Sequence, residues 1–131
     1  MTERQMQIGE VAERTGLSLR TIRHYEEVGL VTPSARSKGG FRLYTEADVE
    51  RLMVIRRMKP LDFSLDEMRD LLEITDRIAG TATEVSADER ARLRERLDAY
   101  RKVADARCEK LRAQLLAAED FAATLRSRLG D

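Results

Sequence analysis

Six basic residues gather between positions 14 and 44 of a chain whose formal net charge is zero. Only two acids, Glu26 and Glu27, lie in the same stretch, so its local charge is +4. Clustered cations neutralise phosphates, and arginine also reads base edges in the DNA major groove. The pattern indicates a nucleic-acid surface, although scattered arginines also occur on ordinary solvated faces. The six cations are Arg14, Arg20, Arg23, Arg36, Lys38 and Arg42.

The other reactive side chains form no catalytic or metal-binding pattern. His24 is the only histidine and Cys108 the only cysteine, which are too few ligands for a metal site. Nucleophile elbows, phosphate-binding glycine loops and zinc motifs are absent from the sequence. We interpret the acid pairs at 26–27 and 88–89 as solvated faces and helix-start charges. We therefore expect no enzyme, cofactor or metal, and we interpret His24 as a DNA contact or a half-exposed packing residue.

The composition suits long, solvated helices. Charged residues make up 37% of the 131 residues and aromatic residues only 5%, which leaves little material for a substrate pocket walled by rings. One cysteine excludes an internal disulfide and fits a reducing compartment. The N-terminus lacks a signal-peptide core, and no apolar run approaches the roughly 20 residues that cross a bilayer. These features predict a cytoplasmic protein without a membrane partner.

Two short helices are predicted around a glycine. A helix over 8–15 carries apolar residues at the spacing of one face, and Gly16 ends it. Ser18 can cap a second helix over 18–28. Two helices joined by a glycine-containing turn form a helix-turn-helix candidate. Two of the six cations would then project from the second helix.

A short β-hairpin is predicted after these helices. Pro33 forbids helix continuation, and the glycine pair at 39–40 marks a tight turn. Phe41, Leu43 and Tyr44 favour a strand. The alternative is a plain surface loop, but glycines between strand-like flanks favour a wing. The wing would carry Arg36, Lys38 and Arg42.

Two further helices have capping signals. Thr45 and Asp48 form a capping arrangement before the third helix. Pro60 should end that helix and push Lys59 out of helical geometry. Ser64 opens a capping box for the fourth helix, which should end near position 80. The predicted buried stripe of the fourth helix is Leu65, Met68, Leu71 and Leu72.

One long helix is predicted for the rest of the chain. After a linker over 80–85, a capping box begins at Ser86, and no proline or glycine follows until Gly130. At 1.5 Å per residue such a helix is about 66 Å long. Its apolar residues recur mostly in alternating steps of four and three, with one four-four step around Ala104, which is typical of a coiled-coil seam. The chain has no spare helix of comparable length, so we expect self-association. The seam comprises Leu93, Leu97, Tyr100, Ala104, Cys108, Leu111, Leu115, Ala118, Ala122, Leu125 and Leu129.

The stretch from Ile8 to Ile74 closely resembles the DNA-binding domain of MerR-type transcription regulators. The matching motifs are IGEVA, the run TIRHYE followed by GL, the wing sequence GGFRLY and FSLDEM. The resemblance implies a mainly α winged helix-turn-helix domain over 1–79, with four helices and a β-hairpin. It also implies that the helix over 86–131 is a dimerisation helix, which pairs antiparallel with its mate as a coiled coil after the linker over 80–85.

The resemblance further implies a homodimer bound to double-stranded promoter DNA at a palindromic site. Many members carry Tyr or Phe at the position of His24, and a glycine is common at the position of Asp62. The residues that match the family's recognition helix and wing are Arg20, Thr21, Arg23, His24, Tyr25 and Arg42. With Arg36, Lys38 and Tyr44 of the predicted wing, they are the expected DNA-binding residues.

Members of this family typically act on promoters whose −35 and −10 elements are too far apart. The dimer distorts the spacer so that RNA polymerase engages both elements, which makes the polymerase an indirect partner. Metal sensors of the family carry a cysteine at the start of the dimerisation helix, and this chain has none near Ser86. The resemblance therefore implies no metal site, and it identifies no small-molecule effector.

Two alternatives stay open from the sequence. The long helix could recruit a transcription partner through a second apolar set, Val103, Leu116 and Phe121. Cys108 could make the protein a thiol-responsive regulator, although a buried packing role is the usual one for a cysteine on such a seam.

Overall fold

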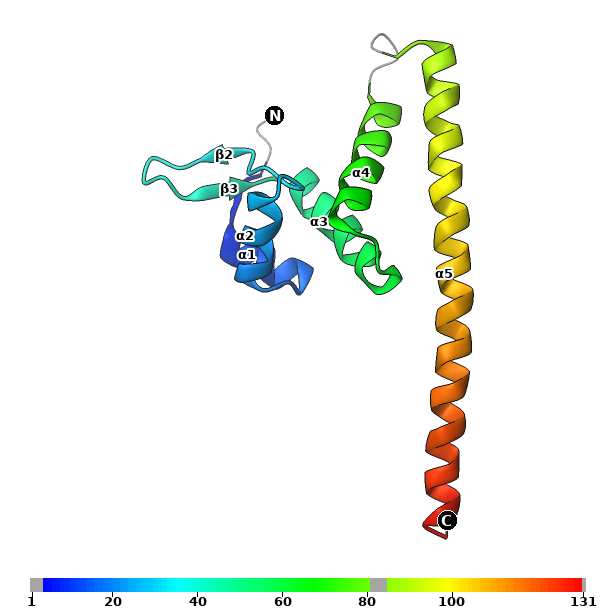
Figure 1. The fold of residues 1–131 in the computed structure, drawn as a ribbon. Coiled ribbons are helices and arrows are strands. Elements are labelled where there is room, and N and C mark those ends of the chain that lie inside the picture. The colour runs from blue at the N-terminus through cyan, green and yellow to red at the C-terminus, as the bar shows by residue number, and fades with distance from the viewer. Residues whose placement is uncertain (1–3, 81–84, 131) are drawn as a thin grey trace. The chain divides into compact units, whose positions relative to one another are not determined.

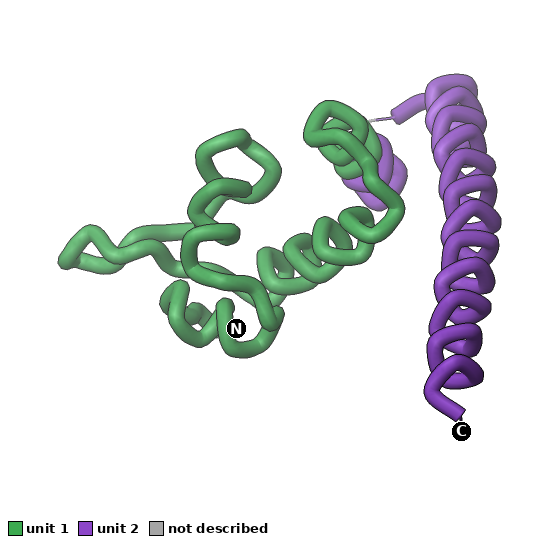
Figure 2. Tube along the Cα trace, turned by 60° about the horizontal axis from the view of Figure 1, so that its bottom comes forward, with its two compact units in different colours: residues 1–73 green, residues 74–131 purple. Residues whose placement is uncertain are grey.

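The computed structural model describes residues 4–80 and 85–130. They form two compact units, 1–73 and 74–131 (Figure 2). The boundary between the units falls within helix α4 (Leu65–Ala79). The predicted linker over 80–85 lies largely outside the described residues, so the predicted domain limits stay a prediction.

Unit 1 contains the predicted helix-turn-helix near its N-terminus (Figure 1). Helix α1 spans Ile8–Thr15 and ends at Gly16, which adopts a left-handed φ of 73°. Helix α2 spans Leu19–Glu27, and the Ser18 hydroxyl accepts a 3.0 Å hydrogen bond from the amide of Thr21. The cap and the glycine turn are local signals, and both predictions are confirmed.

The hairpin is also confirmed, and it belongs to a slightly larger sheet. Strands β2 (Ala35–Arg36) and β3 (Arg42–Tyr44) pair antiparallel, and the hairpin extends away from the helices of its unit (Figure 1). Gly40 in the turn has a φ of 82°. Strand β1 (Met6–Gln7), which was not predicted, pairs with the other edge of β3, so the strand order is β1-β3-β2. The third strand attaches the base of the hairpin to the start of α1.

Helix α3 (Glu46–Met58) has the predicted capping box between Thr45 and Asp48. The expectation for its end was wrong, because Lys59 keeps right-handed helical angles and opens a 3₁₀ turn, η1 (Lys59–Leu61). Pro60 lies in the first turn of η1, where a proline needs no amide donor. Asp62 then ends the turn with a left-handed φ of 58°, a conformation that the glycine implied here by the resemblance would adopt without strain.

The capping box before helix α4 is confirmed by two reciprocal hydrogen bonds. The amide of Ser64 donates to the Glu67 carboxylate at 2.8 Å, and the amide of Glu67 donates to the Ser64 hydroxyl at 3.1 Å. Met68 and Leu72 are buried as predicted, whereas Leu71 is only half-buried and Leu65 is 37% exposed. The prediction for Leu65 was wrong because it is the first residue of α4, before the helix face meets the core. The core of unit 1 includes Val11, Ile22, Tyr25, Leu30, Tyr44, Leu52 and Ile55.

Unit 2 is the end of α4 together with helix α5 (Ala87–Arg128), which is continuous over 42 residues. The Ser86 hydroxyl caps α5 by accepting from the amide of Glu89 at 3.1 Å. Arg90 donates to the carbonyl of Ile78 at 2.8 Å, and Arg77 forms an ion pair with Glu89. These contacts fasten the first turn of α5 to the last turn of α4.

A small core supports that junction. Ile74, Val85 and Leu93 are buried together, and Ile78, Leu97 and Tyr100 pack against them. None of the described helices is long and apolar enough to cross a membrane.

Candidate nucleic-acid interface

Helix α2 presents a basic face and buries the opposite one. Ile22 and Tyr25 are 0% and 1% exposed and fix the helix on the core of unit 1. The positions three and four residues apart on the other face are Arg20, Arg23 and His24, and all three are exposed. These residues and Glu27 border a shallow depression. No hydrogen bond or ion pair with the described residues engages Arg20 or Arg23.

Glu26 binds the wing to the end of α2. Its side chain is only 15% exposed, and its Oε2 lies 2.6 Å from Nε of Arg42. The Tyr44 hydroxyl donates to the same oxygen at 3.1 Å, and Nη2 of Arg36 lies 3.8 Å from Oε1. The interpretation of Glu26 as part of a solvated face was therefore wrong. A carboxylate that faces two cations and a phenol from a hairpin is a structural connection between α2 and the wing.

The contact with Glu26 also raises the pKa values of Tyr44 and Arg42. Burial, together with the negative charge of Glu26, raises the pKa of Tyr44 to about 12. The hydrogen bond and charge of Glu26 raise the pKa of Arg42 above its usual value. The phenol therefore stays neutral and Arg42 stays charged at neutral pH.

The wing tip presents one further cation. Lys38 is exposed beside the glycine turn, and no interaction with the described residues engages its ammonium. Arg36 is exposed as well, but its Nη1 donates to the carbonyl of Gly40 at 3.1 Å. Arg36 therefore stabilises the turn, while Lys38 is the cation at the wing tip that a phosphate can reach without displacing an internal partner.

Three of the expected DNA-binding side chains serve the fold instead of facing a ligand. Tyr25 and Tyr44 are 1% and 0% exposed, so their rings belong to the core and offer no face to a ligand. Thr21 is half-buried, and its hydroxyl accepts from the Ser18 hydroxyl at 2.8 Å. The exposed set that the structure brings together on α2 and the wing is smaller: Arg20, Arg23, His24, Arg36 and Lys38, with Arg42 partly exposed beside them.

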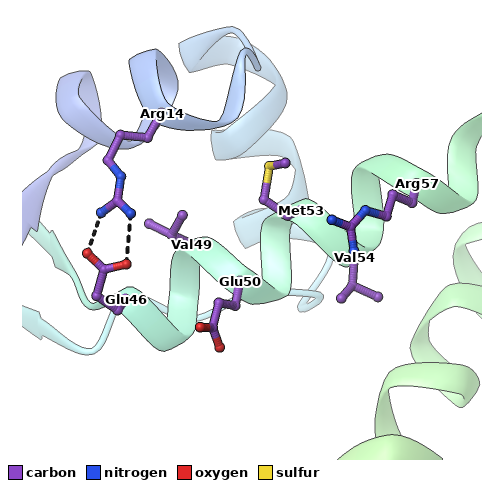
Figure 3. A pocket seen from close by; sticks show the side chains of 7 residues that line it. All are labelled: Arg14, Glu46, Val49, Glu50, Met53, Val54 and Arg57. Carbon is purple, nitrogen blue, oxygen red and sulfur yellow. Dashed lines mark hydrogen bonds and ion pairs between the residues drawn. The ribbon is translucent and has the colours of Figure 1, made fainter.

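Arg14, the first cation of the basic stretch, has a structural partner. Its two terminal nitrogens lie 2.5 and 2.8 Å from the carboxylate oxygens of Glu46 and join α1 to α3 (Figure 3). The pair raises the pKa of Arg14 and lowers that of Glu46. This ion pair borders a groove that Val49 and Met53 also line. The local charge of +4 therefore overstates the positive charge that helix α2 presents to a ligand, because Arg14 is already paired.

The expected dimer seam on α5 changes character along the helix. Leu93 is 2% exposed and lies in the core of unit 2, against which Leu97 and Tyr100 also pack. Leu111, Leu115 and Leu125 are exposed, by 40%, 59% and 50%. Cys108 is a free thiol of intermediate exposure. No group of three or more metal-ligating side chains occurs in the described parts of the chain.

Comparison with known proteins agrees with this geometry. Residues 6–74 match the family model described as "MerR HTH family regulatory protein", and residues 49–128 match "MerR, DNA binding". The chain belongs to the MerR family. The first match covers the helix-turn-helix, the wing and α3, so the resemblance seen in the sequence is confirmed.

Several curated relatives are named as transcription regulators. The chain is 42% identical to the regulator CueR of Yersinia pestis, over 63% of this chain and 59% of that protein. It is 45% identical to the transcriptional activator mta of Bacillus subtilis, over 51% of this chain and 26% of that protein. The chain thus spans between about a quarter and three fifths of these relatives. Their shared description does not favour the two alternatives raised from the sequence.

Solved MerR-family structures match nearly the whole chain. A crystal structure of HiNmlR, described as a MerR family regulator lacking the sensor domain and bound to promoter DNA, aligns with a TM-score of 0.65 at 26% identity. That alignment covers 95% of this chain and 92% of HiNmlR. The N-terminal part of Mta from Bacillus subtilis aligns with a TM-score of 0.53 at 29% identity, over 96% of this chain and 99% of that one. The predicted mainly α fold, with its wing and long C-terminal helix, is confirmed.

Proposed function

We propose that this MerR-family protein is a sequence-specific, DNA-binding transcription regulator. The observation that carries the proposal is the exposed, unengaged pair Arg20 and Arg23 on α2. A helix of this size fits the major groove, where an arginine donates two hydrogen bonds to the O6 and N7 of guanine. HiNmlR, which shares the fold, is described as bound to promoter DNA.

The wing would hold the DNA backbone beside that helix. Lys38 is placed to neutralise a phosphate, and the contacts of Glu26 with Arg42 and Tyr44 keep the wing at the end of α2. Phosphate contacts fix register and orientation without reading sequence, whereas base contacts supply specificity. We therefore assign base recognition to α2 and backbone anchoring to the wing.

The protein would act as a homodimer through α5. Exposed leucines along the distal half of α5 need a partner, because a 42-residue helix with such a stripe is not stable in water alone. A two-fold dimer presents two recognition helices and reads an inverted repeat. Distortion of an over-long promoter spacer, with RNA polymerase as an indirect partner in the cytoplasm, is the mode of action that the family suggests.

A footprint tests the proposal. The purified protein is incubated with the DNA upstream of its own gene at moderate salt, alongside the variant Arg20→Ala/Arg23→Ala. We expect the parent to protect an inverted repeat and the variant to protect none, with unchanged helical content by circular dichroism. Equal protection by parent and variant would contradict the assignment of base recognition to α2.

A further inference from the structure

Two arginines from other helices hold the C-terminal end of α2. The carbonyls of Val28 and Leu30 lie where α2 ends, and a helix leaves its last carbonyls open and partly negative. Arg69 of α4 donates from Nη2 to the Val28 carbonyl at 2.5 Å. Arg51 of α3 donates from Nε to the Leu30 carbonyl at 2.6 Å. Each carbonyl therefore has a cationic donor that α2 itself does not supply.

The guanidinium of Arg69 is also held from its own helix. Its Nη1 lies 3.1 Å from the Asp66 carboxylate, three residues earlier on α4. Its other terminal nitrogen reaches the backbone of a residue 41 positions away in the chain. The Arg69 side chain is 48% exposed, so this contact lies at the surface and not in the core. Arg69 is thus a surface bridge from the start of α4 to the end of α2.

We infer that Arg69 is a positioning residue for DNA recognition, which holds the end of α2 so that Arg20 and Arg23 meet the bases at a fixed angle. The inference rests on the DNA binding of the proposed function. Recognition groups work only when they are held within about 0.5 Å and 10–20° of the productive geometry. Helix α2 has nine residues and is about 14 Å long at 1.5 Å per residue, so a displacement of its end reaches both arginines.

Arg69 connects α2 to a different element from the other contacts at this end. Glu26 connects α2 to the wing, and Arg51 connects it to α3. Arg69 connects it to α4, whose later residues Ile74 and Ile78 belong to the core of unit 2. The angle of α2 therefore depends on the wing, α3 and α4 together. Loss of one bridge should let the helix end shift without unfolding unit 1, because the buried face of α2 stays in place.

A shift of α2 should affect base contacts more than phosphate contacts. An arginine that reads guanine needs a bidentate geometry, whereas a phosphate attracts a cation over a longer distance. Loss of the Arg69 bridge should therefore reduce the discrimination between cognate and scrambled DNA. The dependence of affinity on salt follows the number of neutralised phosphates, so it should stay the same.

Fluorescence anisotropy with full-length Arg69→Gln and Arg69→Lys tests the inference, on the operator found by the footprint and on a scrambled duplex. The ratio of the two dissociation constants should fall about ten-fold in Arg69→Gln, as if one base contact were lost. Arg69→Lys should retain most of the ratio, because its ammonium can still donate to the Val28 carbonyl. Arg57→Gln, which removes an exposed arginine of α3, is the matched control and should leave the ratio unchanged. Thermal unfolding midpoints should stay similar, as is usual for surface substitutions.

The outcomes separate the inference from the proposed function. A parent that binds both duplexes equally overturns the proposed function and the inference with it. A parent that discriminates, with an Arg69→Gln variant that keeps the full ratio, overturns the inference alone. Equal losses on both duplexes with a shallower salt dependence also overturn it, because Arg69 would then itself meet phosphate. If Arg69→Gln does not fold, Asp66→Asn decides, since its side chain is 94% exposed: a lowered ratio supports the inference and an unchanged one overturns it.

Discussion

Glu26 decides which cations of the basic stretch are available for DNA. It lies 2.6 Å from Arg42 and accepts from Tyr44, so the wing arginine is held while Arg20 and Arg23 are left open. This role was not predictable from the sequence, because its partners lie 10 to 18 residues away on a hairpin whose register only the fold defines. The exposure of Arg20 and Arg23 was predictable, because helix periodicity places them opposite Ile22 and Tyr25.

Arg23→Ala should weaken binding to the cognate site by about 1–3 kcal/mol while binding to scrambled DNA changes much less. The reason is that a base contact discriminates between sequences, whereas a phosphate contact does not. Fluorescence anisotropy on both duplexes measures the difference. Lys102→Ala, which removes one exposed charge from α5, is the matched control. Equal losses on both duplexes would show that Arg23 meets only phosphate.

Tyr44→Phe should flatten the alkaline limb of the stability profile. The folded pKa of Tyr44 is about 12, above its ordinary value of 10, so the neutral phenol favours the folded state. That contribution is fully present below pH 10 and is lost as the pH rises toward 12. Urea unfolding at pH 9 and pH 11 measures it. A parent that loses no more stability than Tyr44→Phe between these two pH values would refute the burial of the phenol beside Glu26.

At the scale of elements, the sequence predicted features that depend on neighbouring residues, such as helix caps and turns. It did not predict the pairing of strands that lie far apart in the chain. Capping serines at 18, 64 and 86 and the glycine turn at 16 depend on neighbours within four residues, and all were predicted. Strand β1 is two residues long and pairs with Leu43 and Tyr44 far along the chain, so no periodicity reveals it. The helical Lys59 contradicts a rule that holds on average, because the 3₁₀ turn closes through the amide of Asp62 on the Lys59 carbonyl at 2.9 Å.

Gly16→Ala should destabilise unit 1 by about 1–2 kcal/mol, the cost of a left-handed backbone for a residue with a Cβ. The space itself is adequate, since the nearest atoms to an added Cβ belong to Arg56 at 3.7 Å. Gly9→Ala within α1, where an added Cβ meets nothing within 4 Å, is the control and should gain about 0.5–1 kcal/mol. Thermal unfolding of both variants measures the contrast. Equal midpoints would show that the turn at Gly16 does not require its positive φ.

At the scale of the whole molecule, the proposed dimer depends on the apolar residues of α5 and not only on its helical content. The seam was predictable as a stripe, and its division into a part covered by α4 and an exposed part was not, because Ile74, Ile78 and Val85 reach Leu93 only in the folded unit. Its exposed leucines would supply the apolar burial that the proposed dimer requires. In that dimer each copy of unit 1 would carry one recognition helix, so the pair would read two half-sites.

Truncation of Leu115 tests that dependence, because its side chain is 59% exposed on the expected seam of α5. Leu115→Ala should weaken the proposed dimer by about 2–5 kcal/mol, since it deletes apolar atoms that the dimer would bury. Sedimentation equilibrium measures the dissociation constant, and Leu116→Ala, outside the expected seam, is the matched control and should leave it nearly unchanged. Equal dissociation constants for the parent and Leu115→Ala would contradict a dimer held by this seam.

Selection from a random duplex pool tests the central claim, that a dimer of this chain reads DNA sequence through α2, most directly. The full-length protein is used to enrich bound duplexes over several rounds at moderate salt. We predict an inverted repeat whose half-sites are related by two-fold symmetry, bound by one dimer with an affinity that falls steeply as salt rises. A pool that stays random after selection, or an enriched site that the Arg20→Ala/Arg23→Ala variant binds as tightly as the parent, would contradict the claim.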